Sequence, residues 1–63
     1  MIIFILKHSA EPLGGDMYKT VCVLGDGRSA ELLCYETNGA PSRERLQALL
    51  DTVPEAFKFH GPD

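Results

Sequence analysis

The sequence predicts a single α+β domain in which a three- or four-stranded antiparallel sheet carries one amphipathic helix on one face. Three observations predict this class: apolar, strand-like segments in the first half, an Asp26-Gly27 turn signal between two of them, and a leucine stripe at helical spacing after them. The predicted order is β-β-β-α, with a short final β in the four-stranded version. A chain of 63 residues builds only one small core, so we expect one domain over residues 1–63, frayed at 61–63.

The first predicted strand is residues 1–6, a continuous apolar run rich in isoleucine. Side chains alternate between the two faces of a strand, and neither alternate set is polar here, so the run predicts a central strand buried on both faces. Residues 9–16 contain Pro12 and the pair Gly14-Gly15, and they read as a turn-rich connection.

Residues 17–24 and 29–37 are the next two predicted strands, joined as a hairpin. If Asp26 and Gly27 alone form the loop, counting outward sets Tyr18 opposite Tyr35.

The same register sends the two cysteines to opposite faces of the hairpin, so a disulfide within the chain is not expected. Both faces of the hairpin are half apolar, and a lone helix covers only one of them.

The helix is predicted from Pro41 in its first turn to Pro54, which ends it. The apolar positions between them recur at i, i+3, i+4 and i+7 and are Leu46, Leu49, Leu50 and Val53. Beyond the helix, residues 55–60 alternate phenylalanines with polar side chains, which indicates a short final strand or an extended tail.

Composition excludes several classes of protein. A formal net charge of -3 does not suit a nucleic-acid binder, which usually carries a basic patch, so nucleic acid is not an expected partner. The apolar N-terminal run lacks a basic flank and is far shorter than a membrane span, so we expect a cytoplasmic chain with no membrane partner and reduced cysteines.

The residues that could carry chemistry are few. The histidines and cysteines, which are His8, His60, Cys22 and Cys34, lie on four separate segments without the close spacing of a zinc site. The glycine-rich segments match neither a P-loop nor a dinucleotide-binding fingerprint. We therefore expect no metal, no cofactor and no catalytic residue.

An interface is the preferred kind of site. In the predicted register Tyr18, Thr20, Leu33 and Tyr35 share the face away from Val21 and Leu32. Tyrosines are enriched at interfaces because a large apolar ring carries a hydroxyl that tolerates a wet rim. These four residues are the predicted binding surface for a partner or a second copy.

The preferred function is a small intracellular protein-binding module that acts as a stoichiometric inhibitor or accessory factor, of the kind that phages and mobile elements encode. We also expect a homodimer, because a sheet face left uncovered by the helix exposes apolar area. Two alternatives stay open. One is a subunit of an oligomeric enzyme whose site forms between protomers from His8, Cys22 or Cys34, and the other is an antitoxin-like DNA-binding regulator that uses Arg43 and Arg45.

Overall fold

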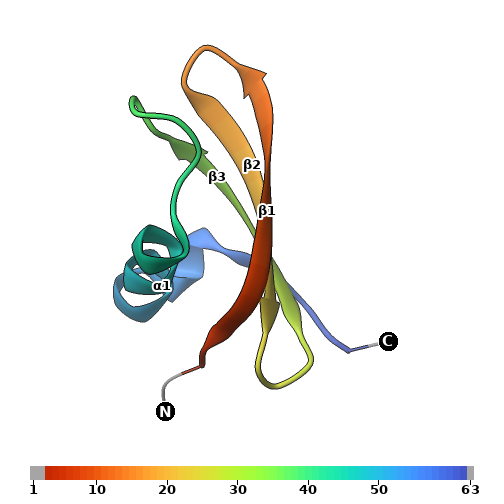
Figure 1. Ribbon diagram of the computed structural model, residues 1–63. Coiled ribbons are helices and arrows are strands. Elements are labelled where there is room, and N and C mark those ends of the chain that lie inside the picture. The colour runs from red at the N-terminus through yellow and green to blue at the C-terminus, as the bar shows by residue number, and fades with distance from the viewer. Residues whose placement is uncertain (1–2, 63) are drawn as a thin grey trace.

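A computed structural model describes residues 3–62 and contains a four-stranded antiparallel sheet with one α-helix against it (Figure 1). In chain order the elements are β1 (Ile5–Gly14), β2 (Met17–Leu24), β3 (Ser29–Tyr35), α1 (Arg43–Thr52), the 3-10 turn η1 (Pro54–Ala56) and β4 (Lys58–His60). The strands lie in the order β1-β2-β3-β4. The predicted α+β class and the β-β-β-α order are therefore confirmed, with the short final strand present.

The first strand differs from its prediction in place and in extent. β1 is an edge strand, not a central one, and it runs through residues 9–14, which the sequence predicted as a turn. Its apolar start is only partly buried, since Leu6 is 65% exposed while Ile5 is fully buried. Pro12 fits within β1 because an edge strand has one side on which a backbone donor is not needed. Met1 and Ile2 of the predicted run, and Asp63 of the predicted tail, lie outside the described residues.

The β2-β3 hairpin has a loop one residue longer than predicted. The Leu24 amide donates to the Arg28 carbonyl at 2.8 Å, so three residues form the loop, and Gly27 takes a φ of 93°. A type I turn followed by a residue at positive φ is the common three-residue hairpin loop. The whole register therefore differs by one residue from the predicted one: Thr20 pairs with Leu32 instead of Leu33.

The helix α1 begins one residue after its cap, Ser42, whose hydroxyl accepts a hydrogen bond from the Arg45 amide at 3.1 Å. Pro41 precedes the cap, so it lies outside the helix instead of in its first turn. Leu46 and Leu50 are buried, whereas Val53 at the end of the predicted stripe is 37% exposed. The helix ends before Pro54, as predicted.

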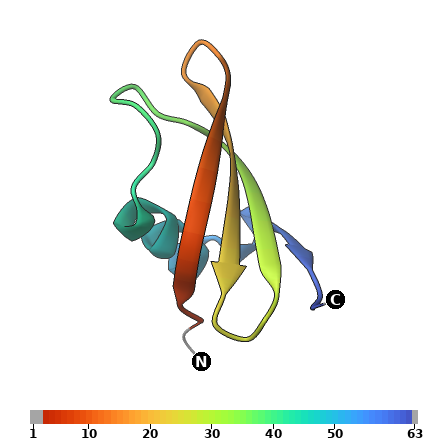
Figure 2. The same cartoon turned by 45° about the vertical axis from the view of Figure 1, so that its right-hand side comes forward.

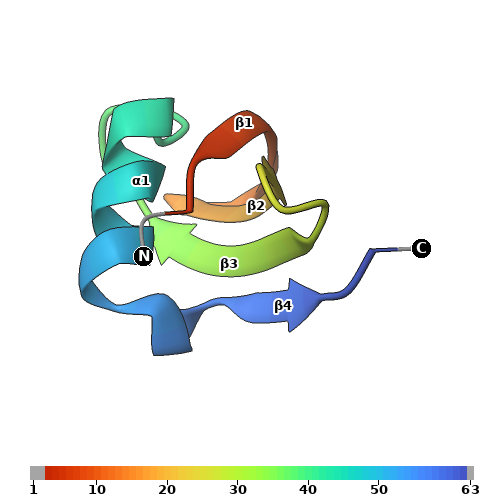
Figure 3. The same ribbon diagram turned by 90° about the horizontal axis from the view of Figure 1, so that it is seen from below.

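The core lies between α1 and one face of the sheet, which we call the covered face (Figure 3). Apolar side chains of the strands, α1 and the segment before β4 meet there: Ile5, Cys22, Leu24, Ala30, Leu32, Leu46, Leu50 and Phe57. Thr20 is the buried polar residue among them, and its hydroxyl donates to the Leu32 carbonyl at 3.0 Å. The opposite face, which we call the open face, has no helix over it in the described part of the chain (Figure 1).

Side chains of α1 also occupy the outer edge of β1 at its start. The Gln47 side-chain carbonyl accepts from the Ile5 amide at 3.0 Å, and its amide group donates to the Ile3 carbonyl at 2.9 Å. The Arg43 guanidinium donates to the Ile5 carbonyl at 2.8 Å. These bonds take the place of a neighbouring strand, so this end of the β1 edge is closed to another chain.

Candidate interaction surface

The open face is a grid of side chains set by the strand register. Residues that pair across strands share a face, and every second residue along a strand returns to it. From β1 to β4 the open-face residues are Lys7, Ser9, Glu11, Met17, Lys19, Val21, Val23, Ser29, Glu31, Leu33, Tyr35, Lys58 and His60. The grid has four rows, and only the two nearest the β2-β3 loop reach β4, at His60 and Lys58.

The exposed apolar part of this face lies on β3. Leu33 is 63% exposed and Tyr35 is 72% exposed, and the two are neighbours on the same face of the strand. On β2, Val21 is diagonal to Leu33 and half-buried, and Val23, farther along the strand, is half-buried as well. An aliphatic and an aromatic side chain held side by side on a rigid strand are the kind of anchor that protein interfaces use.

The four sequence-predicted interface residues do not share one face. Leu33 and Tyr35 are on the open face, but Tyr18 pairs with Cys34 and lies on the covered face, where Thr20 is fully buried. The prediction that Tyr18 stands opposite Tyr35 is wrong because the three-residue loop shifts the register by one residue, which reverses the face of every β3 side chain relative to β2. The role of Leu33 and Tyr35 in binding stays a prediction.

Charge on the open face differs from that of the whole chain. All three lysines of the sequence, Lys7, Lys19 and Lys58, are on this face, against the two carboxylates of Glu11 and Glu31. The chain as a whole carries -3, so the open face is its more positive side. From the sequence these lysines could be considered only as part of a basic patch with the arginines, because their common face depends on the register of strands far apart in the chain.

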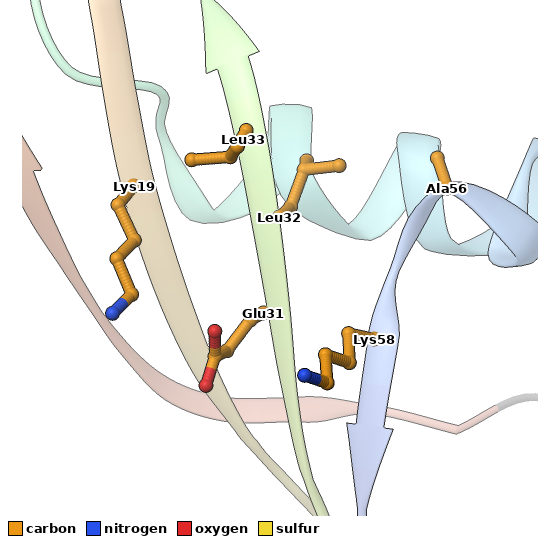
Figure 4. A pocket seen from close by; sticks show the side chains of 6 residues that line it. All are labelled: Lys19, Glu31, Leu32, Leu33, Ala56 and Lys58. Atoms are coloured by element: carbon orange, nitrogen blue, oxygen red, sulfur yellow. The ribbon is translucent and has the colours of Figure 1, made fainter.

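A groove of about 470 Å³ lies beside β3, next to Lys58, the first residue of β4 (Figure 4). Its walls come from β2, β3, η1 and β4, and its lining residues are Lys19, Glu31, Leu32, Leu33, Ala56 and Lys58. Figure 4 shows the Glu31 side chain between those of Lys19 and Lys58. A smaller hollow of about 320 Å³ lies on the β1 side of the face, at Lys7 and Val23.

The acidic group in the groove already has a partner. Glu31 Oε1 lies 3.1 Å from His60 Nε2 on β4. The ion pairs among the described residues involve arginines, and the Glu31–His60 contact is an ion pair only when the imidazole is protonated; none of these contacts includes Lys19 or Lys58. The two ammonium groups are therefore available to a partner that carries negative charge.

The backbone of β3 is open beside this groove. Hydrogen-bonded and non-hydrogen-bonded pairs alternate along an antiparallel ladder, and the bonded pairs of this hairpin include Leu24 with Arg28 and Asp16 with Glu36. By this alternation Leu33 and Tyr35 direct their amide and carbonyl groups away from β2. Since β4 pairs only with residues 29–31, these groups have no strand beside them in the described part of the chain.

The thiols are placed for packing. Cys22 is fully buried, and burial raises the pKa of its thiol, with the neighbouring Cys34 adding to the shift. Burial also raises the pKa of the half-buried Cys34 thiol, with a smaller contribution from Glu36. Both thiols share the covered face, so the prediction that they point to opposite faces is wrong, and both are free.

The groups named for the two alternative functions are placed as follows. His8 is the cross-strand partner of Cys22, but a fully buried thiol with a raised pKa is the reverse of an activated nucleophile. Arg43 binds the Ile5 carbonyl, and Arg45 lies 3.2 Å from Glu36, so both guanidinium groups have partners within the chain. Across residues 3–62 no cluster of three or more histidine, cysteine or acidic residues could hold a metal ion.

Comparisons with protein-family models, curated protein sequences and solved structures find no match to this chain. Within the described residues, no helix is both long enough and apolar enough to cross a membrane. The function is therefore inferred from the geometry and chemistry of the open face.

Proposed function

We propose that this chain is a small protein-binding module, which acts by stoichiometric contact as an inhibitor or accessory factor. The observation that carries the proposal is the pair Leu33 and Tyr35, both mostly exposed on one face of a strand. Exposed apolar anchors on a rigid sheet, with polar groups around them, match the pattern of a protein interface. The lysines of the open face supply the polar surround.

The experiment is a comparison of captures from host lysate by the tagged wild-type chain and by two single variants. Tyr35→Ser removes an anchor of the open face, and Val53→Ser is the matched control, since Val53 is an exposed apolar residue at the end of α1. We expect one stoichiometric protein with wild type and Val53→Ser, and much less with Tyr35→Ser. Equal capture by all three chains would remove the open face from the proposal, and recovery of nucleic acid or a metabolite in place of a protein would contradict it.

A homodimer is the second candidate, favoured by the same strand. The free part of the β3 edge is centred on Cys34, with Leu33 and Tyr35 on either side of it. A twofold axis at this point would set Leu33 of one copy against Tyr35 of the other, so the edge is complementary to itself. A dimer formed in this way would compete with a partner for one surface.

A further inference from the structure

The geometry points to an extended, acidic segment of a partner protein that binds as an added strand along the free edge of β3, next to β4. This inference rests on the proposed function and names the chemistry and the binding mode of the partner. It is carried by three features: the unpaired backbone of β3, the groove beside it, and the two lysines that line the groove.

The backbone supplies the first part of the recognition. Leu33 and Tyr35 each present an amide donor and a carbonyl acceptor outward, on the side where β4 is absent. An extended peptide placed there would continue the ladder that β4 begins at Glu31. In Figure 3 the chain upstream of β4 runs toward α1 instead of continuing alongside β3.

The two edges of the sheet differ in how they are protected. The start of the β1 edge is closed by Gln47 and Arg43, and Pro12 farther along has no amide hydrogen to offer. Charged side chains, prolines and covering groups are the usual means by which proteins close an edge against other chains. Lys58 and η1 stand beside the β3 edge at Leu33, but in the described residues no hydrogen bond closes its backbone as Gln47 and Arg43 close that of β1, which makes it the more available of the two.

The groove supplies the charge preference. Lys19 and Lys58 flank it, Glu31 is engaged by His60, and neither lysine has an ion-pair partner among the described residues. A strand laid beside β3 points alternate side chains to the open face, where those near the groove would meet the two ammonium groups. Acidic side chains at these positions gain complementary charge, and basic ones meet repulsion.

The probe for the test is a blocked, fluorescein-labelled peptide of about seven residues that alternates glutamate with valine, a length typical of a strand. Two control peptides carry either lysine in place of each glutamate or N-methyl groups on alternate amides. Binding to the full chain is measured by fluorescence anisotropy. We expect the glutamate peptide to bind at least about tenfold more tightly than either control, because one lacks the charge match and the other cannot extend the ladder.

Variants of the chain separate charge from backbone. Lys19→Glu should weaken the affinity for the glutamate peptide about tenfold. The matched control Lys7→Glu, on the same face but at the β1 side, should change this affinity by less than about twofold. Tyr35→Pro removes an outward amide and should abolish binding, whereas Tyr35→Thr keeps that amide and should retain part of it. Circular dichroism and melting curves confirm that each variant is folded.

The inference is overturned if the N-methylated peptide binds as well as its parent, or if Lys7→Glu weakens binding as much as Lys19→Glu. It is also overturned if no peptide binds and the chain instead dimerises through β3. A lysate partner that is lost with Tyr35→Ser but retained by Lys19→Glu would refute the acidic added strand and leave the proposed function standing. Loss of that dependence on Tyr35 would refute the proposed function itself.

Discussion

The helix stripe offers a graded test of how α1 stabilises the domain. Leu50→Ala removes a side chain that is only 6% exposed, and a buried leucine truncated to alanine costs about 2 to 4 kcal/mol through lost transfer free energy and the cavity left behind. Val53→Ala removes two methyl groups from a residue already 37% exposed, which limits the cost to about 1 kcal/mol. Leu49→Ala, at a half-buried position, should fall between them.

These differences are large for so small a domain. At about 0.05 to 0.15 kcal/mol per residue, a chain of 63 residues has a free energy of unfolding of about 3 to 9 kcal/mol. With a urea dependence near 1 kcal/mol per M, Leu50→Ala should lower the unfolding midpoint by about 2 M or more, and Val53→Ala by no more than about 1 M. The chain has no tryptophan, so far-ultraviolet circular dichroism is the suitable signal. Equal midpoint shifts in Leu50→Ala and Val53→Ala would show that the stripe does not pack as described.

Three further predictions concern the loop, the thiols and self-association. Gly27→Ala should cost about 1 to 2 kcal/mol because φ is 93° there, while Gly25→Ala, whose added Cβ meets only ordinary contact at 3.6 Å, should cost clearly less in the same urea titration. Burial raises the pKa of the Cys22 thiol in the folded state, so the thiol's contribution to stability is complete at neutral pH and declines as the pH rises through the ordinary thiol range. The difference in unfolding free energy between wild type and Cys22→Ala should therefore shrink between about pH 7 and about pH 9.5. A constant difference would contradict a buried neutral thiol. If the second candidate, the homodimer, holds, light scattering at micromolar concentration should give a mass near twice 6.9 kDa for wild type and near 6.9 kDa for Tyr35→Asp, and a wild-type monomer would exclude the homodimer.

The fold class and the helix could be predicted because their signals are local. The spacing of Leu46 and Leu50 indicates a helical stripe without reference to the rest of the chain, and Pro54 marks its end wherever the helix lies. The alternation of Phe57 and Phe59 likewise predicted the final segment, where Phe57 is buried against the core. Such features depend on neighbours a few residues apart, which the sequence displays directly.

The candidate surface was harder to predict because it depends on a loop length. The same Gly25-Asp26-Gly27 sequence fits a two-residue and a three-residue hairpin loop, and the choice between them reverses the face of each β3 residue relative to β2. Counting from the shorter loop grouped Tyr18 with Tyr35, which lie on opposite faces. The longer loop pairs Cys22 with Ala30 and sends Glu31 to the other face, and this separation of apolar from charged side chains could have favoured it.

The position of β1 at the edge was equally hidden from the sequence. An apolar run of six residues is typical of a central strand, but part of this run gains cover from outside the sheet. Ile3 packs against the core cluster, and the backbone of Ile5 is bonded by Gln47 and Arg43, which lie 42 and 38 residues farther along the chain. No local pattern indicates a partner at that separation.

Because the Ile5 amide is bonded to the Gln47 side chain, hydrogen exchange at this amide reports on one event, the departure of α1 from the sheet. Most strand amides are protected from exchange with solvent by the neighbouring strand, and they stay protected as long as the sheet persists. The helix α1 lies beside the start of β1 (Figure 2). The Ile5 amide is bonded to a side chain of this helix, at 3.0 Å and 42 residues away, so it exchanges whenever the helix leaves the sheet, even if every strand remains paired. Its exchange rate, read beside that of an amide in the middle of β2, would therefore measure the undocking of α1 separately from global unfolding.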